Sequence, residues 1–175
     1  MAKSSVHRLL TLAAAALVLA AGLTVALSRS AAPAHRVDPA VQRKVDEYLA
    51  ANPGGRQINA TEIAYGNGEL IVTIVPEAGI LGVADCPTGW FCFYDYVNFG
   101  YPRGKLSDCG WQDLGNWGWR DRTESVHYNM ASGSVTFINE TGSVDTALFS
   151  VDTVHRTISD VSPYRNMADY VYRYC

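Results

Sequence analysis

Hydrophobic positions follow three different spacings along the 175 residues. Residues 9–27 form a nearly continuous apolar run, and residues 41–49 repeat apolar side chains at helical spacing. From residue 61 onward, apolar and polar residues alternate in short segments separated by glycine, aspartate and asparagine. Because a helix repeats about every 3.6 residues and a strand about every two, the pattern predicts one short helix followed by an all-β region.

The helix is expected to begin at Asp38-Pro39, because aspartate caps a first turn and proline fits the first helical position. Gly54-Gly55 ends it, after an apolar stripe of Val41, Val45, Tyr48 and Leu49. Residues 61–75 then predict a β-hairpin, with Gly66-Asn67-Gly68 as its turn. A helix and a hairpin of about 40 residues cannot bury enough surface to fold alone. Residues 35–80 therefore dock on the main domain, act as a pro-segment, or are only partly ordered.

Residues 86–128 hold three of the four cysteines, and ten of the nineteen aromatic residues lie between Trp90 and Trp119. Glycine, aspartate and asparagine interrupt this stretch too often for a long helix. Strands are expected near residues 90–96, 103–107, 123–130, 134–139, 146–152 and 168–174. Short strands at this spacing are typical of a β-sandwich or a small barrel.

Two parts of this region resemble one another at an offset of about 45 residues. Residues 120–126 (RDRTESV) align with residues 165–171 (RNMADYV), and residues 90–95 align with residues 135–140. The similarity is either due to chance or the mark of an internal duplication. In a duplication, the two copies would bury their apolar faces by packing as facing sheets.

Residues 1–34 have the pattern of a secretory signal, with Lys3 and Arg8 before the apolar run and Ala32-Pro33-Ala34 as a cleavage site. The alternative is an uncleaved membrane anchor, because a 19-residue run is long enough to span a bilayer. We expect cleavage and secretion to the extracellular space. Removal of residues 1–34 leaves 11 basic and 17 acidic residues, a formal net charge of about −6. This balance argues against a nucleic-acid partner, which would require a basic stripe.

The four cysteines, Cys86, Cys92, Cys109 and Cys175, all lie in the exported part. In an oxidising compartment they imply two disulfides, with three pairings open. The short spacing of Cys86 and Cys92 favours a local loop, which leaves Cys109 with Cys175. A zinc site is the alternative, but the chain has neither a CxxC pair nor a Cys/His cluster.

The motifs of the first half resemble a known family. CPTGWFC at residues 86–92 leads into an aromatic strand, followed by Asn98-Phe99-Gly100, DCGWQDL at residues 108–114, and Asn116-Trp117-Gly118. These residues resemble the secreted actinobacterial metalloproteinase inhibitors of peptidase inhibitor family thirty-six. The resemblance covers about residues 86–175 and is strongest over residues 86–128. It implies a βγ-crystallin-like sandwich of two Greek-key motifs, preceded here by the helix-plus-hairpin segment.

The crystallin-like fold also implies a folded hairpin in the first motif. Tyr94 and Phe99 match the family's aromatic spacing, while its glycine is displaced to Gly100. Glycine suits this place because it adopts backbone conformations closed to other residues. Ser125 is the candidate for the serine whose hydroxyl ties down the hairpin backbone.

Many members of this fold bind calcium, and the resemblance gives as candidate ligands Asp121, Glu124, Ser125, Asn166 and Asp169. In both motifs an arginine, Arg120 or Arg165, replaces the first acidic residue. An arginine there repels calcium, which needs about six to eight oxygen ligands. Glu124 and Asp169 either compensate or pair with these arginines. We expect structural ion pairing, with calcium as an optional ligand and no required cofactor.

The sequence gives no sign of an enzyme. It contains no GxSxG, HExxH or phosphate-loop motif, and His35, His127 and His155 have no evident nucleophile partner. The resemblance implies a secreted, monomeric inhibitor whose partner is a metallopeptidase. The family's second local cysteine pair, which braces the reactive loop, is missing here, so the sequence does not identify that loop.

The alternative function is an extracellular calcium- or glycan-binding module of the crystallin type. Its candidate binding residues are Trp111, Trp117 and Trp119, in a turn-rich segment. Exposed aromatic rings can stack on sugars or fill a partner's pocket. The competing interpretation is that these three indoles fill the core, since tryptophan is usually well buried.

Overall fold

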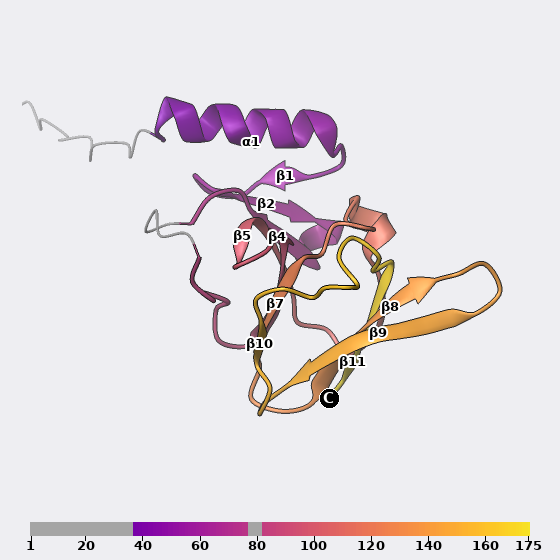
Figure 1. The fold of residues 1–175 in the computed structure, drawn as a ribbon. Coiled ribbons are helices and arrows are strands. Elements are labelled where there is room, and N and C mark those ends of the chain that lie inside the picture. Colours follow the sequence, from indigo (N-terminus) through magenta and orange to yellow (C-terminus); the bar gives the residue numbers. More distant parts are fainter. Residues whose placement is uncertain (1–36, 77–81) are drawn as a thin grey trace, which may run out of the picture. The chain divides into compact units, whose positions relative to one another are not determined.

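The computed structural model describes residues 37–76 and 82–175. These residues belong to one compact unit. The predicted signal sequence and its cleavage site lie outside the described residues. The described residues are mostly β-structure in two antiparallel sheets, with α1 as their one α-helix (Figure 1).

The helix α1 (Pro39–Ala51) confirms the predicted start and stop. The Asp38 side chain accepts a hydrogen bond of 2.7 Å from the Ala40 amide, which satisfies one of the free donors of the first turn. Val45 and Tyr48 form its buried stripe. The helix therefore contributes one apolar side to the core and leaves the other in solvent.

The first sheet has seven strands, in the order β1 (Arg56–Gln57), β2 (Glu62–Tyr65), β3 (Leu70–Thr73), β5 (Gly100–Leu106), β4 (Trp90–Tyr96), β7 (Ser125–Asn129) and β10 (Thr157–Ile158). The second sheet has four, in the order β6 (Gly110–Asp113), β11 (Tyr170–Tyr174), β8 (Ser134–Glu140) and β9 (Asp145–Asp152). The six predicted strands are confirmed, although β5 begins at Gly100, earlier than expected. The very short β1, β6 and β10 were missed, because two to four residues are too few for an alternation to be recognised.

The N-terminal segment docks on the main domain by extending the first sheet. Strand β3 pairs with β5, with Val72 opposite Gly104. The ammonium of Lys105 lies 2.6 Å from a carboxylate oxygen of Glu62, which adds an ion pair between the two parts. The hairpin that was predicted at residues 61–75 is confirmed as β2 and β3, joined by the turn η1 (Gly66–Gly68). A pro-segment can dock in the same way, so removal of residues 35–80 stays a prediction.

The core lies between the two sheets and is largely aromatic. Phe93 of β4 contacts Trp119 edge-on, with ring centroids 5.1 Å apart, and Phe137 of β8 at 6.2 Å. Phe91 and Val171 are also fully or almost fully buried there. The facing copies of the predicted duplication thus supply the two sides of one core.

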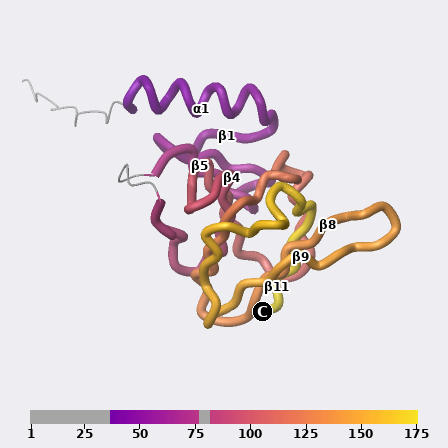
Figure 2. The backbone as a smooth tube through the Cα atoms, in the orientation of Figure 1, coloured from indigo at the N-terminus to yellow at the C-terminus, as the bar shows by residue number. Residues whose placement is uncertain are grey.

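The two halves of residues 90–174 exchange one strand each. Strands β4, β5 and β7 belong to the first sheet while β6, from the same half, joins the second. The second half mirrors this, since β10 joins the first sheet. Figure 1 shows β10 beside β7, and Figure 2 traces the backbone of both halves, the second in orange to yellow.

Hydrogen bonds between the halves are reciprocal at the predicted offset. The Asp121 amide donates to the Ala168 carbonyl at 3.0 Å, and the Asn166 amide donates to the Thr123 carbonyl at 3.1 Å. Asp121 and Asn166 also share a left-handed backbone conformation, with φ of 57° and 55°. Equivalent residues therefore have equivalent roles, as a duplication requires.

Candidate functional site

The outer side of the second sheet carries exposed aromatic residues. Along β11, Val171 and Arg173 are buried, while the alternate residues Tyr170, Tyr172 and Tyr174 are partly or fully exposed. Trp111 of the neighbouring strand β6 lies directly opposite Tyr172. We call Trp111, Tyr170, Tyr172 and Tyr174 the aromatic face.

Trp111 is the most exposed tryptophan of the described residues, at 58%. Its ring centroid lies 6.0 Å from that of Tyr170 and 5.5 Å from that of Tyr172, and both pairs are close to perpendicular. Tyr172 contacts Tyr174 in turn, at 4.5 Å. These contacts fix the orientation of the indole while much of its surface stays in water.

Two grooves border Trp111. The larger, of about 460 Å³, is lined by Trp111, Asp113, Asn116, Glu140, Asp145 and Tyr170. The smaller, of about 240 Å³, shares Trp111, Asp113 and Asn116 with it and also includes Glu69 and Asp108. The larger volume falls in the range of roughly 300–1,000 Å³ that is usual for small-molecule sites.

Arg120 organises the polar side of the larger groove. Its guanidinium makes two hydrogen bonds of 3.0 Å to the carboxylate of Asp113 and one of 3.0 Å to Glu140. It also donates to the hydroxyl of Tyr170 at 2.7 Å and lies 4.6 Å from the centre of that ring. The bonds to Asp113 raise the pKa of Arg120 above its usual value. Tyr170 donates in turn to Glu140, and this bond raises the pKa of its phenol.

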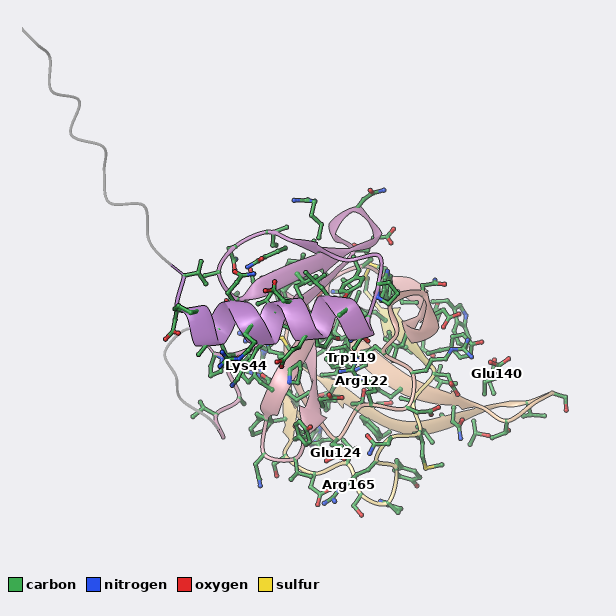
Figure 3. All side chains as sticks on the ribbon, turned by 90° about the horizontal axis from the view of Figure 1, so that it is seen from above. Lys44, Trp119, Arg122, Glu124, Glu140 and Arg165 are labelled. Carbon is green, nitrogen blue, oxygen red and sulfur yellow. A yellow bond between two sulfur atoms is a disulfide. The ribbon has the colours of Figure 1, made fainter. Side chains whose placement is uncertain are left out.

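Of the other two predicted binding candidates, Trp119 does not reach this surface, whereas Trp117 lines the smaller groove. Trp119 is completely buried, and Trp117 is 8% exposed. The turn η2 (Leu114–Trp117) ends at Gly118 in a left-handed conformation, and the chain then brings Trp119 against Phe93. The guanidinium of Arg122 lies 4.4 Å from the centre of the Trp119 ring, beside α1 (Figure 3).

The predicted folded hairpin is confirmed. Tyr94 and Phe99 contact edge-on at 5.5 Å, as the aromatic spacing predicted. The Ser125 hydroxyl accepts a hydrogen bond of 3.0 Å from the Phe99 amide and donates one of 2.7 Å to the Tyr96 carbonyl. Asn98 and Phe99 adopt left-handed conformations, so the strain lies on these residues rather than on Gly100.

The candidate calcium ligands are engaged in backbone and inter-half contacts. Glu124 accepts from the Val97 amide at 3.2 Å and from the Asn166 side chain at 2.9 Å. Asp169 accepts from the Glu140 amide at 2.8 Å. Asp121 is exposed, and the pKa of its carboxyl is raised by partial burial and by the charge of Asp169. Within residues 37–76 and 82–175, no group of three histidine, cysteine or acidic side chains has the geometry of a metal site.

The arginines of the two motifs form the predicted type of ion pair, but mainly with other carboxylates than Glu124 and Asp169. Arg120 lies 3.8 Å from Asp169, farther than from Asp113 and Glu140. Arg165 donates to Asp160 at 2.7 Å, although Glu124 lies near it (Figure 3). Structural ion pairing is thus present at both motifs, with mostly different carboxylates.

Both predicted disulfides are present. Cys86 is bonded to Cys92 and Cys109 to Cys175, with Cα atoms 5.6 Å and 5.9 Å apart. No cysteine of the described residues is free. The second bond holds β6 close to the C-terminus, and therefore anchors the edge of the sheet that carries Trp111.

A second polar cluster lies around the first disulfide. Asp85 accepts hydrogen bonds from the hydroxyls of Tyr94 and Tyr101 and pairs with Arg103 at 2.9 Å. His127 Nδ1 accepts from the Cys86 amide at 3.1 Å, and burial lowers the pKa of this histidine. These groups hold residues 85–86 against β4 and β7.

Sequence reasoning found Trp111 and Trp117 but missed other members of the site, Tyr170, Tyr172, Tyr174, Asp113, Asn116, Glu140 and Asp145. The signal for the tyrosines was present as the alternation YVYRY at residues 170–174. Nothing in the sequence indicated that this strand would pair with residues 110–113.

No helix among the described residues is long and apolar enough to cross a membrane. None of the protein-family models, curated proteins or solved structures compared with the chain matches it.

Proposed function

We propose that residues 86–175 are a βγ-crystallin-type pair of Greek keys and that the protein is a secreted, non-catalytic inhibitor of metallopeptidases. The observation that carries the fold is the strand exchange, in which β6 and β10 each join the sheet of the other half. The family that the motifs of residues 86–128 resemble has this type of fold. Two disulfides are compatible with the oxidising compartment that the predicted signal sequence implies.

The inhibitory function rests on the sequence resemblance and on a rigid framework that suits it. Both ends of residues 86–175 are held by disulfides, and the core between the sheets is closely packed with aromatic side chains. A preordered inhibitor loses less conformational entropy on binding than a flexible peptide. This rigidity favours a protein that occupies a peptidase cleft without rearranging.

The β8–β9 hairpin is the segment that we propose for insertion into the cleft. It projects beyond the rest of its sheet (Figure 1), and residues 139–147 have mostly exposed side chains. Its turn is closed by hydrogen bonds from the Thr141 amide and hydroxyl to the Val144 carbonyl, at 3.2 Å and 2.6 Å. Val144 is 64% exposed, and an apolar side chain at such a tip can fill a pocket of the partner.

The test is a titration of a thermolysin-type metallopeptidase with the purified secreted protein. We expect activity to fall in proportion to the inhibitor added. Val144→Asp should weaken inhibition by about tenfold or more, since it places a charge in an apolar pocket. Val154→Asp is the matched control, because Val154 is exposed but lies away from the hairpin tip, and it should inhibit normally. Full peptidase activity in molar excess of the wild-type protein would refute the proposal.

A further inference from the structure

We propose that Trp111 and the two grooves beside it form a binding site for an oligosaccharide of neutral or basic sugars. This inference does not rest on peptidase inhibition, since its central residue is Trp111 of the aromatic face, although the larger groove adjoins the β8–β9 hairpin through Glu140 and Asp145. Its starting point is an indole that the fold holds in place and leaves largely in water.

The aromatic part of the site is ordered before any ligand binds. Tyr170 and Tyr172 hold Trp111 at near-perpendicular angles of 83° and 75°. The disulfide of Cys109 anchors the start of the strand that carries Trp111. An indole fixed in this way offers apolar area at little cost in side-chain entropy, and the C–H groups of a sugar ring can pack on it.

The polar part of the site has unused hydrogen-bonding groups. The Asn116 amide and the Asp145 carboxylate make no side-chain hydrogen bond to the rest of the described chain, and both line the larger groove. Glu140 uses one oxygen for Arg120 and Tyr170, which leaves the other available. Amide and carboxylate groups next to an exposed indole match a ligand with many hydroxyls, because each hydroxyl can donate as well as accept.

The charge of the grooves narrows the class of sugar. Together they are lined by five carboxylates, Glu69, Asp108, Asp113, Glu140 and Asp145, and by no lysine, arginine or histidine. Arg120 is bonded to Asp113 and Glu140 and its side chain is 34% exposed, so its charge offsets part of this negative charge. Glu69, Asp108 and Asp145 have no such partner in the grooves. Glu140 and Asp145 lie directly opposite one another on β8 and β9, a like-charge pair that opposes folding. A polyanionic ligand would be repelled, whereas a neutral sugar is tolerated and an amino sugar is attracted.

The arrangement of the grooves indicates an oligomeric ligand. The larger and smaller grooves share Trp111, Asp113 and Asn116, so the indole stands between two adjoining depressions. A single sugar ring can occupy one of them, whereas a chain of rings can cross Trp111 and use both. A protein partner fits less well, since stable protein interfaces are depleted of acidic residues at their centre.

The experiment is calorimetric titration of the secreted protein with two trimers, chitotriose, which is neutral, and its fully deacetylated form, which is basic. We expect both to bind, the basic trimer more tightly at low salt. Trp111→Ala should weaken binding by about tenfold or more, as for a central aromatic contact. Tyr96→Ala is the matched control, because Tyr96 is also 58% exposed but belongs to the first sheet, and its binding should be unchanged.

Asn116→Ala provides a second variant that leaves the aromatic face intact, and we expect it to bind a few-fold more weakly. Trigalacturonate, a polyanionic trimer, should not bind. The proposal is overturned if neither neutral nor basic trimer binds, if Trp111→Ala binds as well as wild type, or if trigalacturonate binds best. Loss of peptidase inhibition in Trp111→Ala, with no sugar binding by the wild type, would assign the face to the peptidase instead.

Discussion

The two sheets bury their inner faces in one core but treat their outer faces differently. On the first sheet, Cys92 and Tyr94 point away from that core and are nevertheless completely buried, because Cys86 and its neighbours pack over them. On the second sheet, Trp111 and Tyr174 are more than half exposed. Both outer faces are aromatic, so composition does not explain the difference. The chain wraps one face and leaves the other open, which is why we assign ligand binding to the second.

The largest expected effect comes from equal truncations on the two outer faces. Tyr94→Ala removes a fully buried ring and should lower the free energy of unfolding by about 3–5 kcal/mol. Tyr174→Ala removes a ring that is 55% exposed and should change it by only about 0.5 kcal/mol. Urea unfolding followed by fluorescence measures both. Similar losses for the two variants would show that the second face is covered as well.

The loss of stability on removing each disulfide should increase with the length of the loop that the bond closes. The Cys109–Cys175 bond closes 66 residues and the Cys86–Cys92 bond only 6. Chain-entropy arguments give losses of about 4 kcal/mol for Cys109→Ser with Cys175→Ser, and about 2 kcal/mol for Cys86→Ser with Cys92→Ser. Thermal unfolding of the two double variants tests this order.

The variant without the Cys86–Cys92 bond also tests whether Cys86 and its neighbours hold the outer face of the first sheet covered. Loss of the Cys86–Cys92 bond should increase hydrogen exchange at residues 85–94 and leave β11 protected. Protection that falls equally in both sheets would contradict a cover that is specific to the first.

Acid should destabilise the folded protein at His127, which bonds Cys86 to the outer face of the first sheet. Burial lowers its pKa below the usual value of about 6.5, so the unfolded chain takes up this proton first as pH falls. The stabilising contribution is therefore present above about pH 6.5 and is lost as pH falls from there through the lower folded pKa. The melting temperature should decrease between about pH 7 and 5 in the wild type.

Two variants isolate the effect of His127. His127→Phe should melt lower at neutral pH, because the Cys86 amide loses its acceptor, and should show less of this pH dependence. His155→Gln is the control, since that side chain is 82% exposed, and it should follow the wild type. An unchanged pH dependence in His127→Phe would assign the destabilisation to other groups.

The smallest expected effect is that of calcium. Glu124 and Asp169 already accept hydrogen bonds from backbone amides, and Arg120 and Arg165 lie beside the two motifs. We therefore expect no change in melting temperature when calcium is added or removed by a chelator. A rise with calcium that disappears in Glu124→Gln would show instead that the first motif binds the ion.

The sequence predicted those parts of the fold that depend on neighbouring residues. The capped helix at Asp38, the hairpin around Gly66-Asn67-Gly68 and six strands were all visible as local patterns. Among three open pairings, the short spacing of Cys86 and Cys92 favoured the one that the structure has. The hydrogen bonds of Ser125 agreed with the motif that suggested them.

The candidate site was predicted only in part, because its members come from distant places in the chain. Trp111 was one of three equivalent candidates, and their burial alone separated it from Trp117 and Trp119. Asp113, Glu140 and Tyr170 meet around Arg120 through the pairing of β6, β11 and β8. No local pattern encodes which strands become neighbours.

The sequence by itself thus determined the strands, the turns and the supply of aromatic rings, since each depends on local spacing, and it favoured one cysteine pairing without fixing it. Only the tertiary structure decided which rings are covered. Alternation assigns a residue to one side of a strand, but exposure depends on what packs over that side. Asp85 and Cys86 cover Tyr94 and Cys92 on the first sheet, and no described segment covers Trp111 in the same way.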